Sequence, residues 1–271
     1  MKIEFEKMSG AGNDFIVIDN RDKKIRNRVS AAKKLCDRHW GIGADGLLLI
    51  EKSKSVAYRM MYFNADGSYG GMCGNGGRCI ALFAYKHGIA KKKHSFDALN
   101  HIYLAEIKSN SVVQLQMKDP IGMSLSKVLN LHGGSLTYHA INTGSPHIIV
   151  DCSNEKDLST VDVHGLGHEL RYHSAFQPEG TNVNFIKNIG LNKAALRTYE
   201  RGVEGETLAC GTGSVASAII ASRIWKFKSP ITIVPTSGVA LSVSFNTNQD
   251  KTSNVLLTGP AKTIFTGSFT I

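Results

Sequence analysis

Two short segments with the same pattern decide the interpretation of this sequence: Cys73-Gly74-Asn75-Gly76 and Cys210-Gly211-Thr212-Gly213. Each precedes an apolar run, which we expect to form a helix from about Asn75 to Gly88 in the first case and from about Thr212 to Trp225 in the second. Both runs are apolar around most of their circumference, as is typical of helices that are buried on all sides. Repetition of the pattern about half a chain apart predicts two related lobes.

Strand-like segments surround both predicted helices. Several of them alternate apolar with polar residues, as half-buried antiparallel strands do. The clearest lie at residues 15–18, 56–63, 112–117, 147–150, 183–186 and 239–245. Since strands flank each all-apolar helix, we expect sheet to enclose the helix, in an α+β fold.

The boundary between the lobes is predicted near Asp119-Pro120, because proline cannot donate a hydrogen bond to the middle of a sheet. We therefore expect an N-terminal lobe of residues 1–118, which carries Cys73. The C-terminal lobe is expected at residues 119–262 and carries Cys210.

The composition is typical of a soluble globular protein, with 42% hydrophobic and 20% charged residues in a chain of 271. No apolar run approaches the ~20 residues that a membrane-spanning helix requires. The first residues lack the apolar core of a signal peptide and carry acids early. We expect a cytoplasmic protein with no membrane partner.

The net charge of +10 raises the question of a nucleic-acid partner. The basic residues are spread along the chain, however. The one dense run, residues 91–94, follows a glycine and is not interleaved with aromatic residues. We therefore expect a solvated basic surface and no nucleic-acid partner, and note that positive potential also suits a substrate with carboxylates.

Five cysteines are present, at positions 36, 73, 79, 152 and 210. Their odd number and wide spacing argue against a disulfide framework. They form neither a four-ligand zinc pattern nor a Cys-X-X-Cys redox motif, so we expect no metal. A free cysteine is most often a small buried hydrophobe, and we keep that interpretation for Cys36, Cys79 and Cys152.

Each Cys-Gly-X-Gly corner combines features that favour an anion and a reactive sulfur. The glycines let the backbone turn sharply and approach a ligand closely. The following helix presents its first N–H groups and the positive end of its dipole, where a carboxylate binds and the thiolate form of cysteine is favoured. One such corner alone is a weak signal, because glycine-rich turns before helices are common.

Two corners together indicate a specific reaction. If both sulfurs flank one α-carbon, a thiolate can remove its proton while the opposite thiol donates to the other face. The N–H groups of both helices would stabilise the charge that spreads into the substrate carboxylate. We therefore expect Cys73 and Cys210 to invert an α-carbon without pyridoxal phosphate, another cofactor or a metal. Gly10-Ala11-Gly12-Asn13 lacks the full dinucleotide fingerprint, so binding of NAD is not expected either.

Blocks spread along nearly the whole chain carry a family resemblance. The blocks that hold the two corners read MCGNGGRC at residues 72–79 and ETLACGTG at residues 206–213. The others lie, in order, at residues 5–15, 38–46, 63–68, 142–147, 179–185 and 199–202. Together these blocks closely resemble the diaminopimelate epimerase family, although no single glycine-rich block is specific.

The resemblance implies conversion of LL-diaminopimelate into the meso form, a step of lysine and cell-wall peptide synthesis, without a cofactor. It implies two pseudo-symmetric lobes, each a β-barrel-like sheet around a central helix, and a homodimer. It also implies that the C-terminal residues 263–271 return to the first lobe.

The resemblance further assigns roles within the matched blocks, with Cys73 and Cys210 as the acid–base pair. The cradle for the reacting carboxylate corresponds to Gly74, Asn75, Gly211 and Thr212, and the contacts to the distal amino-acid group correspond to Asn64, Asn182, Glu200 and Arg201. Asn13 and His147 correspond to residues that line the catalytic end. These residue types suit a zwitterion, because Arg201 can pair with a carboxylate and Glu200 with an ammonium group.

Three departures from the family pattern bear on substrate discrimination. Gly46 stands where many relatives carry Gln, and Ser145 replaces a frequent Asn. The segment from Glu200 to Glu206 is one residue longer than the commonest form. None of these departures changes the two cysteines.

Rival functions come from two classes. A proline or hydroxyproline racemase, or a phenazine-pathway isomerase, would share the architecture; the racemases bind one carboxylate and a ring, and the phenazine-type relatives lack the cysteine pair. A nonenzymatic basic protein that binds nucleic acid would show salt-dependent binding and no dependence on Cys73 or Cys210.

Overall fold

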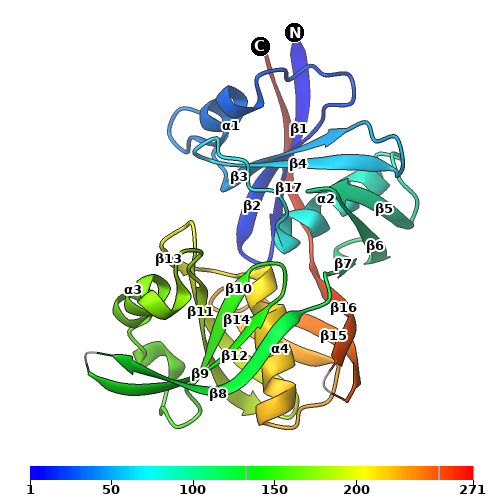
Figure 1. Cartoon of the computed structure of the whole chain (residues 1–271). Coiled ribbons are helices and arrows are strands. Elements are labelled where there is room, and N and C mark those ends of the chain that lie inside the picture. The colour runs from blue at the N-terminus through cyan, green and yellow to red at the C-terminus, as the bar shows by residue number, and fades with distance from the viewer. Residues whose placement is uncertain (132, 250, 271) are drawn as a thin grey trace. The chain divides into compact units, whose positions relative to one another are not determined.

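The computed structural model describes residues 1–131, 133–249 and 251–270, and the chain divides into two compact units (Figure 1). Unit 1 comprises Met1–Gln116 and the chain from Thr258 onward, and unit 2 comprises Met117–Leu257. The expected α+β, two-lobed fold class is confirmed. The predicted lobes ended at residues 118 and 262. The chain returns from unit 2 to unit 1 earlier than residue 262, within the unbroken strand β16 (Lys251–Pro260).

Unit 1 contains one strongly curved run of paired strands. These are β1 (Lys2–Gly10), β2 (Asn13–Asp19), β3 (Gly46–Glu51), β4 (Tyr58–Asn64), β5 (Lys93–Ala98), β6 (His101–Ser109), β7 (Val112–Gln116) and β17 (Lys262–Thr270). They pair in the order β17, β1, β2, β3, β4, β5, β6, β7, with only β2–β3 and β4–β5 parallel. Because β7 also pairs with β16, which leads directly into β17, the run nearly closes on itself.

The helix α2 (Gly74–Lys86) lies inside this curved sheet. It contacts β1, β2, β3, β4, β6 and β7, and all of its residues from Gly74 to Ala84 are buried. Small residues make this enclosure possible: a Cβ at Gly77 would lie 2.7 Å from Met72 Cε and 2.9 Å from Leu115 Cδ2. The predicted buried helix near residues 75–88 is therefore confirmed.

Unit 2 repeats this plan with a different set of elements. Its strands are β8 (Ile121–Leu131), β9 (Gly134–Asn142), β10 (Pro146–Asp151), β11 (Asn182–Gly190), β12 (Lys193–Glu200), β13 (Gly205–Thr207), β14 (Ile231–Pro235), β15 (Leu241–Asn248) and most of β16. The helix α4 (Gly211–Ile224) contacts β9, β10, β11, β12, β14 and β15 and is buried from Gly213 to Ala221 (Figure 1). The second predicted helix is confirmed as well.

The order of parallel and antiparallel pairs is the same in both units. In unit 1 the pairs β1–β2, β2–β3, β3–β4, β4–β5 and β5–β6 alternate between antiparallel and parallel. In unit 2 the pairs β9–β10, β10–β11, β11–β12, β12–β14 and β14–β15 alternate in the same way. Each central helix occurs at the corresponding crossover, so the two units are pseudo-repeats in topology.

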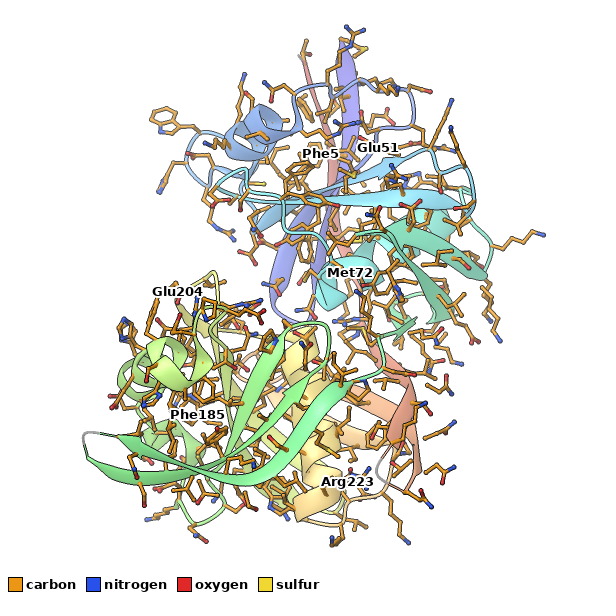
Figure 2. The ribbon with its side chains drawn as sticks, viewed as in Figure 1. Phe5, Glu51, Met72, Phe185, Glu204 and Arg223 are labelled. Carbon is orange, nitrogen blue, oxygen red and sulfur yellow. The ribbon has the colours of Figure 1, made fainter. Side chains whose placement is uncertain are left out.

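One further helix packs on the outer face of the sheet in each unit, and neither was predicted. In unit 1, α1 (Arg28–Cys36) packs on β3 and β4; in unit 2, α3 (Val163–Tyr172) packs on β11, β12 and β13, next to the 3₁₀ turns Leu158–Thr160 and Ser174–Phe176. Phe5 and Phe185, labelled in Figure 2, belong to the apolar clusters beneath these helices. The local signals were the N-caps Asn27 and Asp162, whose side chains accept from the N–H of Ser30 and of Gly165.

Candidate active site

Cys73 lies at the N-terminus of α2, in an extended conformation with φ −119° and ψ 128°. Gly74 is the first helical residue, and the Gly77 N–H donates to the Cys73 carbonyl oxygen at 2.7 Å. The first N–H groups of α2, which have no acceptor within the helix, therefore follow directly on the sulfur-bearing residue. Cys73 is half-buried, and Figure 2 labels its neighbour Met72 at this end of the helix.

The turn between β1 and β2 brings Asn13 to this corner. The buried Asn75 donates through Nδ2 to Asn13 Oδ1 at 2.6 Å, and Asn13 Nδ2 donates to Asp45 Oδ2 at 3.0 Å. The approach of β1 to the helix requires Gly10, where a Cβ would lie 2.9 Å from the Asn75 carbonyl oxygen. Of the predicted residues, Asn13, Asn75 and Cys73 thus gather at the start of α2.

Asn64 ends β4 and lies opposite Gly46 in the β3–β4 pair, with its Nδ2 donating to Ser68 Oγ at 2.9 Å. The ring of Tyr62 fills the space beside Gly46: a Cβ there would lie 2.5 Å from Tyr62 Cε2. A Cβ at Gly70 would lie 2.4 Å from Tyr62 Cε1 and 3.1 Å from Asn64 Oδ1. Tyr62, which sequence reasoning missed, therefore occupies the place that Gly46 leaves open, beside a predicted substrate contact.

Cys210 occupies the corresponding position at the N-terminus of α4, with φ −108° and ψ 117°. The Gly213 N–H donates to Cys210 Sγ at 3.4 Å, and Thr212 Oγ1 lies 3.5 Å from the same sulfur. Ser214 donates to the Cys210 carbonyl oxygen through both its N–H, at 2.9 Å, and its hydroxyl, at 2.8 Å. Cys210 is also more buried than Cys73: it is only 4% exposed, whereas Cys73 is half-buried.

A directional hydrogen-bond network supports this second corner. Asn184 Nδ2 lies 3.0 Å from His147 Nδ1, and His147 Nε2 lies 3.0 Å from Ser145 Oγ, which is itself 3.4 Å from Thr212 Oγ1. His147 is 1% exposed, and burial, with the nearby Arg201 cation, lowers its pKa to about 3. The imidazole is therefore neutral at neutral pH; since Nδ1 accepts from Asn184, Nε2 carries the proton that Ser145 accepts.

The remaining predicted residues of unit 2 join the same network. Asn182 Oδ1 accepts from the Arg201 N–H at 3.0 Å, and Asn182 Nδ2 lies 3.4 Å from Ser145 Oγ. Arg201 Nη1 donates to the Glu179 carbonyl oxygen at 2.8 Å. Ser145, noted above as a departure, thus connects the amide of Asn182 with the hydroxyl of Thr212.

Glu200 lies beside the second sulfur. Burial raises the pKa of the Glu200 carboxyl, and the Thr207 hydroxyl and the Cys210 thiol, which both donate to it, oppose this rise. The Thr207 Oγ1 to Glu200 Oε2 distance is 2.8 Å. The structure therefore brings a carboxyl group, a thiol and a helix N-terminus together in unit 2.

The other three thiols lack the surroundings of a reactive sulfur. Burial raises the pKa of Cys36 and of Cys79 to about 12, and that of Cys152 to about 11. These thiols stay protonated at neutral pH, as expected of packed cysteines.

One cavity of unit 1 is lined by neither of the two cysteines. It measures about 810 Å³, is confined to unit 1 and is lined by Phe83, His87 and residues of β1 and β17, at the C-terminal end of α2. Within the described ranges, no three His, Cys, Asp or Glu side chains are grouped so that they could hold a metal ion. None of the described helices is long and apolar enough to span a membrane.

A family sequence model and several known proteins match this chain over most of its length. The sequence model of the family described as diaminopimelate epimerase matches residues 5–121 and 139–264. Proteins named diaminopimelate epimerase from Flavobacterium psychrophilum and Chlorobaculum tepidum are 41% and 42% identical, over 96% and 97% of this chain and 97% and 100% of their own lengths. A third, from Aquifex aeolicus, is 39% identical over 98% of this chain and 97% of its own.

Solved structures with little sequence identity share the fold. A hydroxyproline epimerase from Agrobacterium vitis with bound trans-4-hydroxy-L-proline has a TM-score of 0.74 at 13% identity, covering 99% of this chain and 91% of that one. A Bacillus anthracis phenazine biosynthesis protein of the PhzF family has the same TM-score and identity, with both chains fully covered. At this identity the likeness extends to the architecture alone.

Proposed function

Because this chain belongs to the diaminopimelate epimerase family, and is accordingly an amino-acid epimerase, we propose that it interconverts LL- and meso-diaminopimelate with Cys73 and Cys210 as the acid–base pair. The observation that carries the proposal is the repeated corner. In each unit a cysteine directly precedes the first turn of the buried central helix. Cys36, Cys79 and Cys152, which also lie in the described part of the chain, do not have this placement.

The proposed reaction is a two-base proton transfer. One sulfur, as the thiolate, takes the α-proton; the C–H electron pair spreads into the substrate carboxylate, and an S–H bond forms. The other sulfur, as the thiol, delivers its proton to the opposite face and becomes the thiolate. Protons and charge balance within the pair, and each turnover exchanges the protonation states of the two sulfurs.

We propose that the first turns of both helices bind the reacting carboxylate. The backbone at Gly74, Asn75, Gly211 and Thr212 supplies N–H groups at the positive ends of the two helix dipoles. Donors fixed in place before the reaction stabilise the charge that develops on the carboxylate without reorganising. Asn13 and His147 support this end: the former orients Asn75, and the latter, as a neutral donor, orients Ser145.

The remaining proposed contacts recognise the rest of the zwitterion. Arg201 pairs with a carboxylate and Glu200 with an ammonium group, while the amides of Asn64 and Asn182 serve either. Tyr62 adds a ring beside Asn64, where Gly46 has no side chain of its own. We propose that this ring restricts the shape of the distal group in this chain.

Deuterium incorporation tests the proposal directly. The protein is incubated with LL-diaminopimelate in D2O without added cofactor, and α-deuterium and stereochemistry are followed together. Wild type should label and epimerise, and Cys73→Ala and Cys210→Ala should each lose epimerisation, since an inversion needs a group on each face. Cys36→Ala, which removes a packed thiol, is the matched control and should retain activity.

Continued epimerisation by either active-corner variant would show that the sulfurs do not form the acid–base pair. Inactivity of wild type on diaminopimelate would shift attention to proline and related amino acids.

We also propose that the chain works as a cytoplasmic homodimer that needs no cofactor and takes part in lysine and cell-wall precursor synthesis. The support is the family resemblance. Sedimentation equilibrium of the purified protein checks the assembly, and a single species of monomer mass at micromolar concentration would contradict it.

A further inference from the structure

We propose that the buried guanidinium of Arg78 is the counter-charge of Cys73 and holds that sulfur as the thiolate in the substrate-free protein, whereas Cys210 rests as the thiol. This inference rests on the proposed function, because it assigns resting states to the two sulfurs of the proposed acid–base pair. It makes Arg78 a positioning residue that acts through Cys73.

The Arg78 side chain is fully buried, at 0% exposure, and the acceptors described for it are neutral oxygens. Nη1 donates to the Gly74 carbonyl oxygen at 3.2 Å, Nη2 to Asn75 Oδ1 at 2.7 Å, and Nε to the Pro260 carbonyl oxygen at 3.4 Å. The guanidinium therefore curls back to the first turn of α2, directly beside the residue that follows Cys73.

Burying such a charge costs free energy unless an anion lies nearby. None of the ion pairs in the described part of the chain includes Arg78. A buried cation without a charged partner is strongly disfavoured, and the positive end of a helix dipole disfavours it further. A negative charge at the same helix end would offset both of these unfavourable effects.

In the substrate-free protein, the candidates for that negative charge reduce to one. Burial lowers the pKa of Arg78, and the groups whose negative charge acts against this lowering are the thiols of Cys79 and Cys73. Burial raises the pKa of Cys79 to about 12, so Cys79 is neutral at pH 7. Cys73, which is half-buried and lies at the N-terminus of the helix, is left as the group that ionises.

The carboxylates on the described strands around α2 lie in other surroundings. Glu4 is exposed, and the others form ion pairs of their own: Glu6–His87, Asp14–Lys7, Asp19–Arg21, Glu51–Arg28, Asp97–Arg59 and Glu106–Lys108. These pairs do not supply Arg78 with a carboxylate. The Cys73 sulfur is therefore the group that we assign as the anion facing this guanidinium.

The pseudo-repeat provides an internal comparison. Arg78 is the fifth residue after Cys73, and the fifth residue after Cys210 is Val215, which is fully buried. At the second corner the neighbouring ionisable group is instead the Glu200 carboxyl, to which the Cys210 thiol donates. A cation beside one sulfur favours its thiolate, and a carboxyl acceptor beside the other favours its thiol, so the two corners differ in resting charge.

Arg78 has a second effect that the test must separate from the first. A guanidinium only donates hydrogen bonds, so it fixes Asn75 with Oδ1 toward Arg78 and Nδ2 toward Asn13. A role limited to orienting Asn75 would alter substrate binding. It would leave the ionisation of Cys73 in the substrate-free protein unchanged.

The test is the pH dependence of alkylation by iodoacetamide, read at each cysteine by peptide mass spectrometry in the substrate-free protein. In wild type, the midpoint for Cys73 should lie about one pH unit or more below that for Cys210. Arg78→Gln should raise the Cys73 midpoint by about one unit or more, equivalent to roughly tenfold less thiolate at neutral pH, and Arg78→Lys by less. Lys86→Gln, which removes a cation from the far end of the same helix, is the control and should change neither midpoint.

A wild-type Cys73 midpoint equal to or above that of Cys210 would overturn the inference, and this comparison needs no variant to fold. A folded Arg78→Gln protein with an unchanged Cys73 midpoint would overturn it as well. Because no substrate is used, the result is distinguishable from a failure of the proposed function, which the deuterium experiment measures separately.

Discussion

At the scale of single residues, burial decides which groups can exchange protons at neutral pH. The thiols of Cys36, Cys79 and Cys152 have raised pKa values, so they stay protonated and contribute only to packing. His147, although histidine is the usual acid–base residue, has its pKa lowered to about 3 and acts only as a fixed donor. Cys73 and Cys210, at the helix corners, are the groups to which we assign the proton transfer in the proposed function.

The lowered pKa of His147 predicts a specific loss of stability in acid. The unfolded chain, with an ordinary histidine, binds a proton as pH falls below about 6.5, whereas the folded protein with a pKa of about 3 does not. This favours unfolding, so stability present above pH 6.5 is lost as pH falls toward 3. Between pH 7 and pH 5, wild type should lose about 2 kcal/mol more than His147→Gln, measured by urea unfolding at both pH values.

An exposed histidine provides the control: in His168→Gln, on the outer helix α3, the acid loss should match wild type. Equal acid losses in wild type and His147→Gln would mean that the imidazole is charged in the folded protein.

At the scale of elements, glycine determines how the central helices begin. Each helix starts one residue after a cysteine in extended conformation, and a Cβ at Gly77 of α2 or Gly213 of α4 would lie closer than 3.0 Å to a neighbouring atom. At α4 a Cβ on Gly213 would lie 2.5 Å from Asn184 Oδ1 and 3.3 Å from Cys210 Sγ. The same glycine therefore supports both the helix start and the hydrogen bond to the sulfur.

Gly213→Ala should consequently damage both stability and catalysis. The added methyl group pushes against Asn184, which orients His147, so we expect a loss of about 1–3 kcal/mol in the free energy of unfolding and a lower epimerisation rate. Gly205→Ala is the matched control, because a Cβ there meets no atom within 4 Å. Its stability should stay within about 0.5 kcal/mol of wild type, measured by the same denaturant titration. Equal effects of the two substitutions would show that the helix start tolerates a side chain.

At the scale of the whole molecule, each unit folds its strands around its own central helix. The C-terminal strand β17 completes the sheet of unit 1. β17 pairs with β1 along a register that runs from Lys2↔Thr270 to Ser9↔Lys262. Phe5 packs against Phe265 and Phe269 of that strand, with ring centroids 6.0 Å and 6.2 Å apart. Unit 1 is therefore built from both ends of the chain, which are adjacent in Figure 1.

Removing residues 262–271 should therefore destabilise unit 1 selectively. Without β17, the strand β1 loses one of its two partner strands and the aromatic contacts of Phe5, while the strands around α4 keep all of their partners. Hydrogen–deuterium exchange should show amides of β1 and α2 losing protection, with those of α4 little changed. A uniform loss of protection in both units would contradict independent sheets.

Much of the fold could be predicted from local sequence. The apolar runs after each corner gave both central helices, and the strand segments were recognised from their alternation, because burial on one face or on all faces leaves a period in the sequence. The outer helices α1 and α3 were missed even though their N-caps, Asn27 and Asp162, are local signals. Their apolar residues cover only one narrow face, so the pattern is weaker than that of a fully buried helix.

The sequence by itself determined the two Cys-Gly-X-Gly corners, the central helices and the family, because these follow from short stretches of chain whose residue types and order are sufficient. Only the tertiary structure decided which groups surround each corner. The Arg78 guanidinium donates a hydrogen bond to the carbonyl oxygen of Pro260, 182 residues away. The neutral His147 accepts one from Asn184, 37 residues away. Desolvation and hydrogen-bond partners depend on which distant segments contact each other, and a local sequence pattern does not specify those contacts.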